Sequence, residues 1–276
     1  MKFIYILLSI WLGLISCKDG EQPTPEIEKP KSKKEITVLS YNIHHSNPPS
    51  KPDFIDLDAV AKVIIESNAD IVGLQEVDVY TERSGSDLHM AEKLAELTGY
   101  DYFYFSKGID YRGGEYGTAI LSKYPLSNEK TIKLPKEEGT EQRTLSLVTV
   151  SLTEESKIYF GNTHMDFTSE SNGLAQAKFI TKYFDESTDN EIPAIVVGDF
   201  NAVPSSPAIL HFDRYFERTC KSGCANTAST NNPRKIIDYI IYKSSKDFEV
   251  ESHQVVNETY ASDHFPVLAK LILKEL

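Results

Sequence analysis

The stretch IPAIVVGDFNAVP, residues 192–204, runs from a short apolar segment directly into Gly198, Asp199 and Asn201. The apolar segment is rich in β-branched residues, which is typical of a strand buried on both faces. We therefore expect a buried strand that ends on a carboxylate and a carboxamide. A single polar residue at a strand end usually forms a turn or caps a helix. Whether this stretch has a chemical function therefore depends on how the other strands end.

Segments of the same character recur along the chain. We expect strands at residues 36–43, 70–77, 118–123, 145–152, 157–165, 194–201, 236–243 and 265–273. Apolar residues at helical spacing predict helices within residues 53–67, 87–97 and 173–184. Several of the strands are apolar on both sides, so both of their faces must be covered. Two sheets packed together, with helices outside each, satisfy this pattern, and the sequence predicts an α/β (α+β) fold.

Polar side chains stand at or next to the ends of six of these strands. They are Asn42, Glu76, His164, Asp199 with Asn201, Asp238, and Asp263 with His264. If the strands converge at one edge of the sandwich, these side chains form one acidic pocket that contains two histidines. Carboxylate and amide oxygens are the ligands that a hard divalent cation prefers. The sequence therefore predicts a cation-binding pocket at that edge.

Composition and charge limit the possible functions. The 276 residues carry a formal net charge of −12, with 40% hydrophobic and 25% charged residues. This balance is that of a globular protein with a sizeable core and excludes the fibrous and disordered classes. Negative charge over most of the surface disfavours loose, charge-driven binding to nucleic acid or anionic membrane. We expect a monomer.

The N-terminal segment has the features of an export signal. Residues 1–17, MKFIYILLSIWLGLISC, combine an early Lys with a short apolar run and a small residue before Cys17. The ending resembles the bacterial lipobox, in which the Cys becomes the lipidated first residue; a cleaved signal with an incidental Cys and an uncleaved anchor are the alternatives. Residues 18–35 predict a flexible tether, and residues 36–276 the folded domain. We expect a protein of the bacterial cell envelope, attached to the membrane through its lipid only, facing the periplasm or on the outer-membrane surface.

Two further cysteines, Cys220 and Cys224, lie four residues apart in a polar loop. In an exported protein this spacing favours a local disulfide over two free thiols. A metal site is the third alternative, although only two sulfurs and no nearby His are present.

Eight short motifs together resemble a known family. They are LSYNI (39–43), GLQEVD (73–78), TERSG (81–85), EYGTAILSKYP (115–125), GNTHMD (161–166), GDFNAVP (198–204), IDYI (237–240) and SDHFPV (262–267). Their order and approximate spacing resemble the endonuclease/exonuclease/phosphatase superfamily, whose members are similar to deoxyribonuclease I. The resemblance implies a four-layer αββα sandwich of two mostly antiparallel sheets and a divalent-metal-dependent phosphoesterase.

A metal site and a phosphate site follow from these motifs. Glu76 supplies a hard oxygen ligand for Mg²⁺ or Mn²⁺, Asn42 a neutral one, and Asp263 a second carboxylate. His164 would approach a phosphate oxygen as a cationic donor, and Tyr116 would donate its phenolic hydrogen to the phosphate. Taken alone, His164 could be a core histidine and Tyr116 a packing residue.

The resemblance assigns the attacking water to Asp199 and His264. Either could be the base, and Asp238 would fix the tautomer of His264. Asn201 would donate a hydrogen bond to the phosphate. Arg83 has two interpretations: a contact to a substrate phosphate, or an ion pair with Glu82 or Asp87.

The substrate class stays open, because the motifs encode phosphoester chemistry and not the leaving group. Nucleic acid, phospholipid and small phosphate esters are all candidates, with a phosphodiesterase as the first expectation. The alternatives are a phosphomonoesterase acting on sugar or inositol phosphates and a non-catalytic protein that binds a phosphorylated ligand. Phe167 and Gly173 depart from the residues that many bacterial members carry at these positions, which leaves substrate contacts in that segment undefined.

Overall fold

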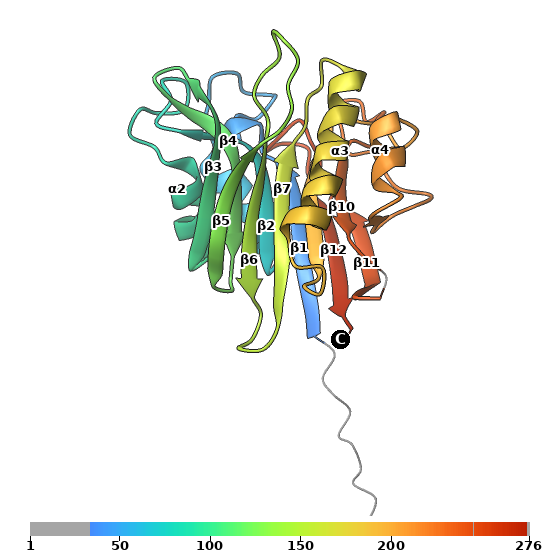
Figure 1. Ribbon diagram of the computed structural model, residues 1–276. Coiled ribbons are helices and arrows are strands. Elements are labelled where there is room, and N and C mark those ends of the chain that lie inside the picture. Colours follow the sequence, from blue (N-terminus) through green and yellow to red (C-terminus); the bar gives the residue numbers. More distant parts are fainter. Residues whose placement is uncertain (1–33, 245, 275–276) are drawn as a thin grey trace, which may run out of the picture. The chain divides into compact units, whose positions relative to one another are not determined.

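Two six-stranded sheets stack face to face in the computed structural model, which describes residues 34–244 and 246–274 (Figure 1). The first sheet has the order β11 (Phe248–Val255), β12 (Val267–Leu273), β1 (Lys34–Asn42), β2 (Ile71–Val79), β4 (Gly114–Ser122) and β3 (Tyr102–Tyr111). The second has the order β5 (Leu126–Lys133), β6 (Thr144–Ser151), β7 (Lys157–His164), β8 (Ala194–Asp199), β10 (Asp238–Tyr242) and β9 (Glu217–Arg218). Among the described strands, only the pairs β1–β2 and β7–β8 are parallel.

Helices cover the outer face of each sheet. Helices α1 (Leu57–Ser67) and α2 (Met90–Thr98) pack on β1, β2 and β4, and α3 (Glu170–Ser187) and α4 (Pro207–Phe212) pack on β6, β7, β8 and β10. A third apolar cluster fills the space between the sheets. The structure therefore has four layers, as the resemblance implies.

The eight predicted strands all form, with ends that move by a few residues. The structure adds β3, β5, β9, β11 and α4, which the sequence analysis did not predict. β3, β5 and β11 are outer or edge strands whose residues are largely exposed or half-buried, so they lack an apolar run. β9 has two residues and α4 six, which is too short for a periodic signal.

A buried amide, two residues before the end of β7, links the two sheets. Asn162 on β7 donates from Nδ2 to the carbonyl oxygens of Leu74 and Ala119, both at 2.8 Å. Its Oδ1 accepts from Nε2 of Gln75 at 2.7 Å. At Gly73 the sheets come so close that a Cβ would lie 2.3 Å from a methyl group of Val197. These contacts fix the spacing of the sheets at the level of the strand ends.

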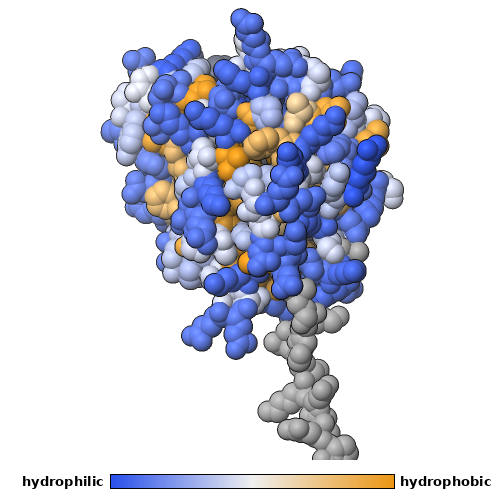
Figure 2. All heavy atoms as spheres, viewed as in Figure 1, coloured by the Kyte–Doolittle hydropathy of each residue, from blue (hydrophilic) through white to orange (hydrophobic). Residues whose placement is uncertain are grey.

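Residues 1–33 lie outside the described residues, so the predicted signal, the lipidation of Cys17 and the envelope location stay predictions. The predicted tether boundary is slightly wrong, because β1 begins at Lys34. No helix within residues 34–244 and 246–274 has the length and apolar character needed to cross a membrane. Hydrophilic residues cover most of the face seen in Figure 2, and apolar residues appear there as small separate groups.

Candidate active site

Three neighbouring strands bring three predicted residues side by side. The parallel strands β7 and β8 pair His164 with Asp199, and the antiparallel strand β10 pairs Asp238 with Asp199. All three side chains are buried. The expected convergence of polar strand ends therefore occurs at this edge of the second sheet.

His264 joins this group from the loop before β12. Its Nδ1 lies 3.0 Å from both carboxylate oxygens of Asp238, and its Nε2 lies 3.7 Å from Oδ2 of Asp199. Its backbone N–H donates to the hydroxyl oxygen of Ser262, and that hydroxyl donates to the carbonyl oxygen of Asn42 at 2.7 Å. The position of His264 is thus tied to the end of β1 in the first sheet.

Burial and charge set the protonation of this pair. Burial alone would lower the pKa of His264, but the charge and hydrogen bond of Asp238, with the charge of Asp199, raise it to about 10. Burial, together with the negative charge of Asp238, raises the pKa of Asp199 to about 7. His264 is therefore protonated at neutral pH, and Asp199 can exchange a proton there.

The loops after β7 and β8 are joined at Asn201. The backbone N–H of Asn201 donates to Oδ1 of Asp199 at 2.9 Å, and its side-chain amide donates to the carbonyl oxygen of Met165 at 3.0 Å. Asn201 has φ 49°, a left-handed conformation that is uncommon for a residue with a side chain. One amide hydrogen is thus used within the protein, and donation to a phosphate stays a prediction.

Asn42 connects the two sheets within the site. Its Nδ2 lies 3.0 Å from Oε1 of Glu76 and 3.2 Å from Oδ2 of Asp199, while its Oδ1 accepts the backbone N–H of His44 at 3.1 Å. In this orientation Asn42 donates to two carboxylates. Its role as an oxygen ligand, which would require the amide to turn over, stays a prediction.

Glu76 does not end its strand, contrary to expectation. β2 continues to Val79, and Glu76 sits at an irregularity of pairing between Gln75 and Val77 with φ 59°. Such a bulge redirects one side chain without ending the strand. Burial would raise the pKa of Glu76, but the surrounding polar side chains, among them the Asn42 amide that donates to it at 3.0 Å, lower it well below its usual range. Glu76 is therefore ionised.

His45 is a neighbour of Glu76 outside the predicted set. Its Nδ1 lies 3.9 Å from Oε2 of Glu76 and is buried without a hydrogen-bond partner. Three consecutive residues, His44, His45 and Ser46, have positive φ values of 46°, 42° and 58°. The only sequence signal for this position is that two histidines follow the strand that ends at Asn42.

Asp263 has a buried oxygen, Oδ1, without a hydrogen-bond partner. Among the described residues, no hydrogen bond joins the Asp263 side chain to Asn42. The three acidic or histidine groups whose ligand atoms do lie within 4.8 Å of one another are Asp199, Asp238 and His264. The group of Asp199, Asp238 and His264 could also hold a cation.

A small pocket contains Tyr116, Arg143 and His164. Arg143 is buried, with its Nη1 3.3 Å from Oε1 of Glu141 and its Nε without a partner. Burial, reinforced by the charge of Arg143, lowers the pKa of His164 far below its usual value. The expected cationic form of His164 is therefore disfavoured. Burial raises the pKa of Tyr116, so its hydroxyl stays a donor. Arg143 was missed because a lone Arg has no spacing signature.

Arg83 forms neither of the two expected ion pairs. Its Nε and Nη2 bind Asp78 at 2.7 and 2.9 Å, and its guanidinium lies 4.6 Å from the ring centre of Tyr111 and 5.5 Å from that of Tyr116. Asp78 also pairs with Tyr116 across the strands. Arg83 therefore helps to position Tyr116, and a contact to phosphate stays a prediction.

Comparison with known proteins identifies relatives that cover most of the folded part. The model of the Endonuclease/Exonuclease/phosphatase family matches residues 39–264. The uncharacterized protein YbhP of Escherichia coli is 25% identical over 248 residues, which cover 86% of this chain and 96% of YbhP. An endonuclease/exonuclease/phosphatase structure from Beutenbergia cavernae has a TM-score of 0.75 at 23% identity, covering 87% of this chain and 72% of that one. The structure of a mannosyl-6-phosphatase of Bacteroides thetaiotaomicron has a TM-score of 0.69 at 21% identity, covering 86% and 100%.

Proposed function

The chain belongs to the endonuclease/exonuclease/phosphatase family, and from this premise we propose that it is a divalent-metal-dependent phosphodiesterase. Members of the family act on phosphoesters and generally use a divalent metal ion. The proposed reaction is hydrolysis of a P–O ester bond of a nucleic acid or a lipid headgroup by attack of water. The observation that supports it most is the meeting of Asp199, Asp238 and His264 in one buried cluster.

The pKa shifts in this cluster support one assignment of the proton transfers. Burial lowers the pKa of His264, but the charge and hydrogen bond of Asp238 raise it further, so in this proposal His264 keeps its proton and is not the base. Asp199, with a pKa of about 7, accepts the proton of the attacking water. Protonated His264 then donates an N–H toward the developing negative charge, and Asp238 keeps that donor in place. Arg143, Tyr116 and neutral His164 offer further donors to the phosphate oxygens.

The residues around Glu76 fit a divalent cation. Glu76 is ionised, and the buried oxygen of Asp263 lacks a donor, which a cation would supply. Glu76, Asp263 and Asn42 would hold Mg²⁺ or Mn²⁺, which would supply positive charge against the non-bridging phosphate oxygens. In the Asp199, Asp238 and His264 group, the protonated imidazole already pairs with Asp238 at 3.0 Å and lies 3.7 Å from Asp199. We therefore assign that group to proton transfer and not to metal binding.

His45 extends the proposed metal set by one nitrogen. Two ligand atoms about 2.1 Å from one ion are no more than about 4.2 Å apart, and Nδ1 of His45 lies 3.9 Å from Oε2 of Glu76. This separation is too long for a hydrogen bond. A nitrogen ligand would favour Mn²⁺ over Mg²⁺, which prefers an all-oxygen site.

Metal binding can be measured without turnover by electron paramagnetic resonance of added Mn²⁺. We expect Glu76→Gln to weaken Mn²⁺ binding by about 10-fold or more, and His45→Ala to remove a nitrogen coupling from the pulsed spectrum. His89→Ala is the control, because His89 lies at the N-terminus of α2. Unchanged binding in Glu76→Gln would contradict the assigned metal site, and an unchanged nitrogen coupling in His45→Ala would remove His45 from it.

The reaction class is tested by hydrolysis of bis-p-nitrophenyl phosphate and p-nitrophenyl phosphate with Mg²⁺ or Mn²⁺. We expect faster release from the diester and complete loss of release with a chelator. Faster release from the monoester would favour the alternative, a phosphomonoesterase acting on sugar or inositol phosphates. Mannose 6-phosphate is included because one structural neighbour is a mannosyl-6-phosphatase. If a chelator-sensitive reaction is found with none of these substrates, nor with DNA, RNA and sphingomyelin, the result would favour the other alternative, a non-catalytic protein that binds a phosphorylated ligand.

A further inference from the structure

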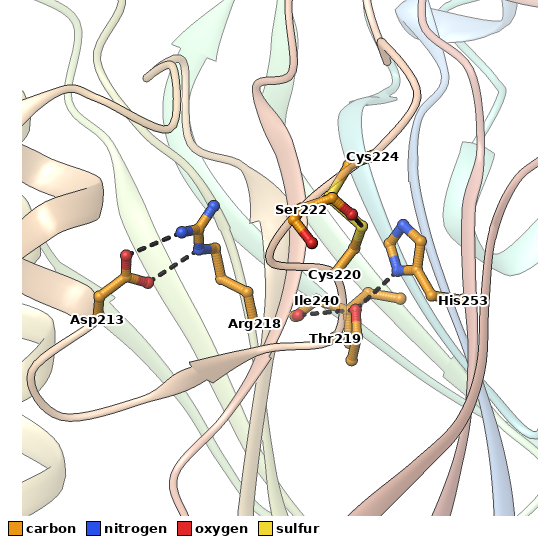
Figure 3. The surroundings of a disulfide bond; sticks show 8 residues. All are labelled: Asp213, Arg218, Thr219, Cys220, Ser222, Cys224, Ile240 and His253. Carbon is orange, nitrogen blue, oxygen red and sulfur yellow. Dashed lines mark hydrogen bonds and ion pairs between the residues drawn. A yellow bond between two sulfur atoms is a disulfide. The ribbon is translucent and has the colours of Figure 1, made fainter.

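A second pocket lies next to the active site and opens to solvent. It is bounded by the loop closed by the Cys220–Cys224 disulfide, by the start of β10, by Pro204 and by His253 of β11. Figure 3 shows His253 beside the disulfide, and Arg218 turned away toward Asp213. Because the disulfide closes this loop, one wall of the pocket is preformed before anything binds.

The pocket offers no unpaired charge to a ligand. Three charged residues line it, and each has a partner of opposite charge. Arg218 binds Asp213 at 2.9 Å through two nitrogens, Lys221 binds Glu217 at 2.8 Å, and Asp238 binds His264 at 3.0 Å. The remaining wall is largely apolar and includes Ile236, Tyr239, Ile240 and Ala225. A neutral, mainly apolar group matches this wall, because a charged group would be desolvated without a free partner.

One polar atom in the wall is defined by the hydrogen bonds around it. The Thr219 hydroxyl donates to the carbonyl oxygen of Ile240 at 3.1 Å, so its oxygen can only accept from Nδ1 of His253 at 2.8 Å. His253 therefore carries its proton on Nδ1, and burial lowers its pKa and keeps the ring neutral. Its Nε2, on the side of the ring away from Thr219 in Figure 3, is a hydrogen-bond acceptor.

The walls of this pocket also support the active site. The hydroxyl oxygen of Thr227 accepts the backbone N–H groups of Ile237 and Asp238 at 3.0 and 3.2 Å. The Tyr239 hydroxyl donates to the carbonyl oxygen of Ala202 at 2.7 Å, which lies between Asn201 and Pro204. The pocket thus adjoins both the residue that orients His264 and the loop that follows Asp199.

We propose that this pocket receives the organic group of the phosphoester, a neutral and mainly apolar ring whose hydrogen-bond donor is accepted by Nε2 of His253. The proposal rests on the proposed phosphoesterase function and defines the class of ester that the site prefers. Esters of aromatic or heterocyclic alcohols would bind through both the phosphate and the ring. Esters of small polyols would bind through the phosphate alone.

Equilibrium dialysis with 4-methylumbelliferone, a neutral ring with one hydroxyl donor, tests the pocket without any turnover. The exposed wall residue Ala225 allows the pocket to be filled by Ala225→Trp, and Asn226→Trp places the same side chain at the next exposed residue, outside the wall. We expect Ala225→Trp to weaken binding at least 10-fold and Asn226→Trp to leave it unchanged. His253→Phe keeps a ring but removes the acceptor, and should weaken binding by about 5- to 10-fold.

The outcomes separate this proposal from the proposed function. No binding to the unmodified protein, or equal binding in the two Trp variants, would overturn the proposal that this pocket binds a ring, even if the protein hydrolyses phosphoesters. Binding that depends on Ala225 in a protein that hydrolyses nothing would support the pocket and leave the proposed function contradicted. In an active enzyme we also expect a raised KM for the diester bis(4-methylumbelliferyl) phosphate in Ala225→Trp, with unchanged KM in Asn226→Trp.

Discussion

Replacing Asp199 by asparagine should lower kcat for the preferred phosphoester by about 10²- to 10⁴-fold, the range that a positioned general base contributes. The substitution keeps the shape of the side chain and an oxygen that can accept the Asn201 N–H, so the loop after β8 stays in place. It removes the group that takes the proton from water. The measurement is steady-state hydrolysis under saturating substrate, together with a thermal melt of each protein.

Asp189→Asn is the matched control for this substitution, because Asp189 is an exposed residue in the loop before β8. It should retain the activity of the unmodified protein. If Asp199→Asn keeps more than about a tenth of kcat, well above the expected range, then Asp199 is not the base. In that case the proton would have to pass to another group.

The site is built from residues of both sheets, so its geometry depends on how closely the two sheets pack. Asn42 and Glu76 come from the first sheet, whereas His164, Asp199 and Asp238 come from the second. The 3.2 Å contact between Asn42 and Asp199 crosses the interface. A shift of the sheets by one ångström would separate the proposed metal site from the proposed base, so close packing at Gly73 and the Asn162 hydrogen bonds are part of the functional design.

The central strands could be predicted because burial leaves a clear pattern in sequence. β8 is buried along its whole length, so its apolar run and the polar residue that ends it stand out. The edge strand β5 has exposed residues at five successive positions and resembles a loop in sequence. An edge strand is held by hydrogen bonds to one neighbouring strand, and no local sequence pattern encodes these hydrogen bonds.

Side-chain partners were harder to predict than positions. The sequence offered Glu82 and Asp87 as neighbours for Arg83, but the buried carboxylate of Asp78, five residues away, binds it. The bulge that turns Glu76 into the site and the buried position of Arg143 also depend on tertiary structure. Motif order identified several residues that meet, including Asp199, Asp238 and His264. The three-dimensional structure was needed to determine how they are protonated.

Replacing Asp238 by asparagine should lower kcat by about 10²- to 10⁴-fold without removing any group that contacts substrate. Asp238 holds the proton on His264 through its charge and its hydrogen bond, which raise the pKa of the imidazole to about 10. Without this carboxylate, burial lowers that pKa and is opposed only by the smaller effects of the Asp199 and Asp263 charges. We expect His264 to be neutral at pH 7.5 in the variant, as measured by the ¹⁵N chemical shifts of its ring.

Asp238→Asn should also change how the free energy of unfolding depends on pH, which a loss of activity alone would not reveal. The pKa of folded His264, about 10, lies above its ordinary value of 6.5. The pair therefore contributes fully to the free energy of unfolding below about pH 6.5 and loses this contribution as pH rises through about 10. The difference in unfolding free energy between the unmodified protein and Asp238→Asn should be largest at pH 6.5 and shrink by pH 10, as measured by urea denaturation. A difference that stays constant over this range, or grows, would mean that Asp238 does not hold the proton on His264.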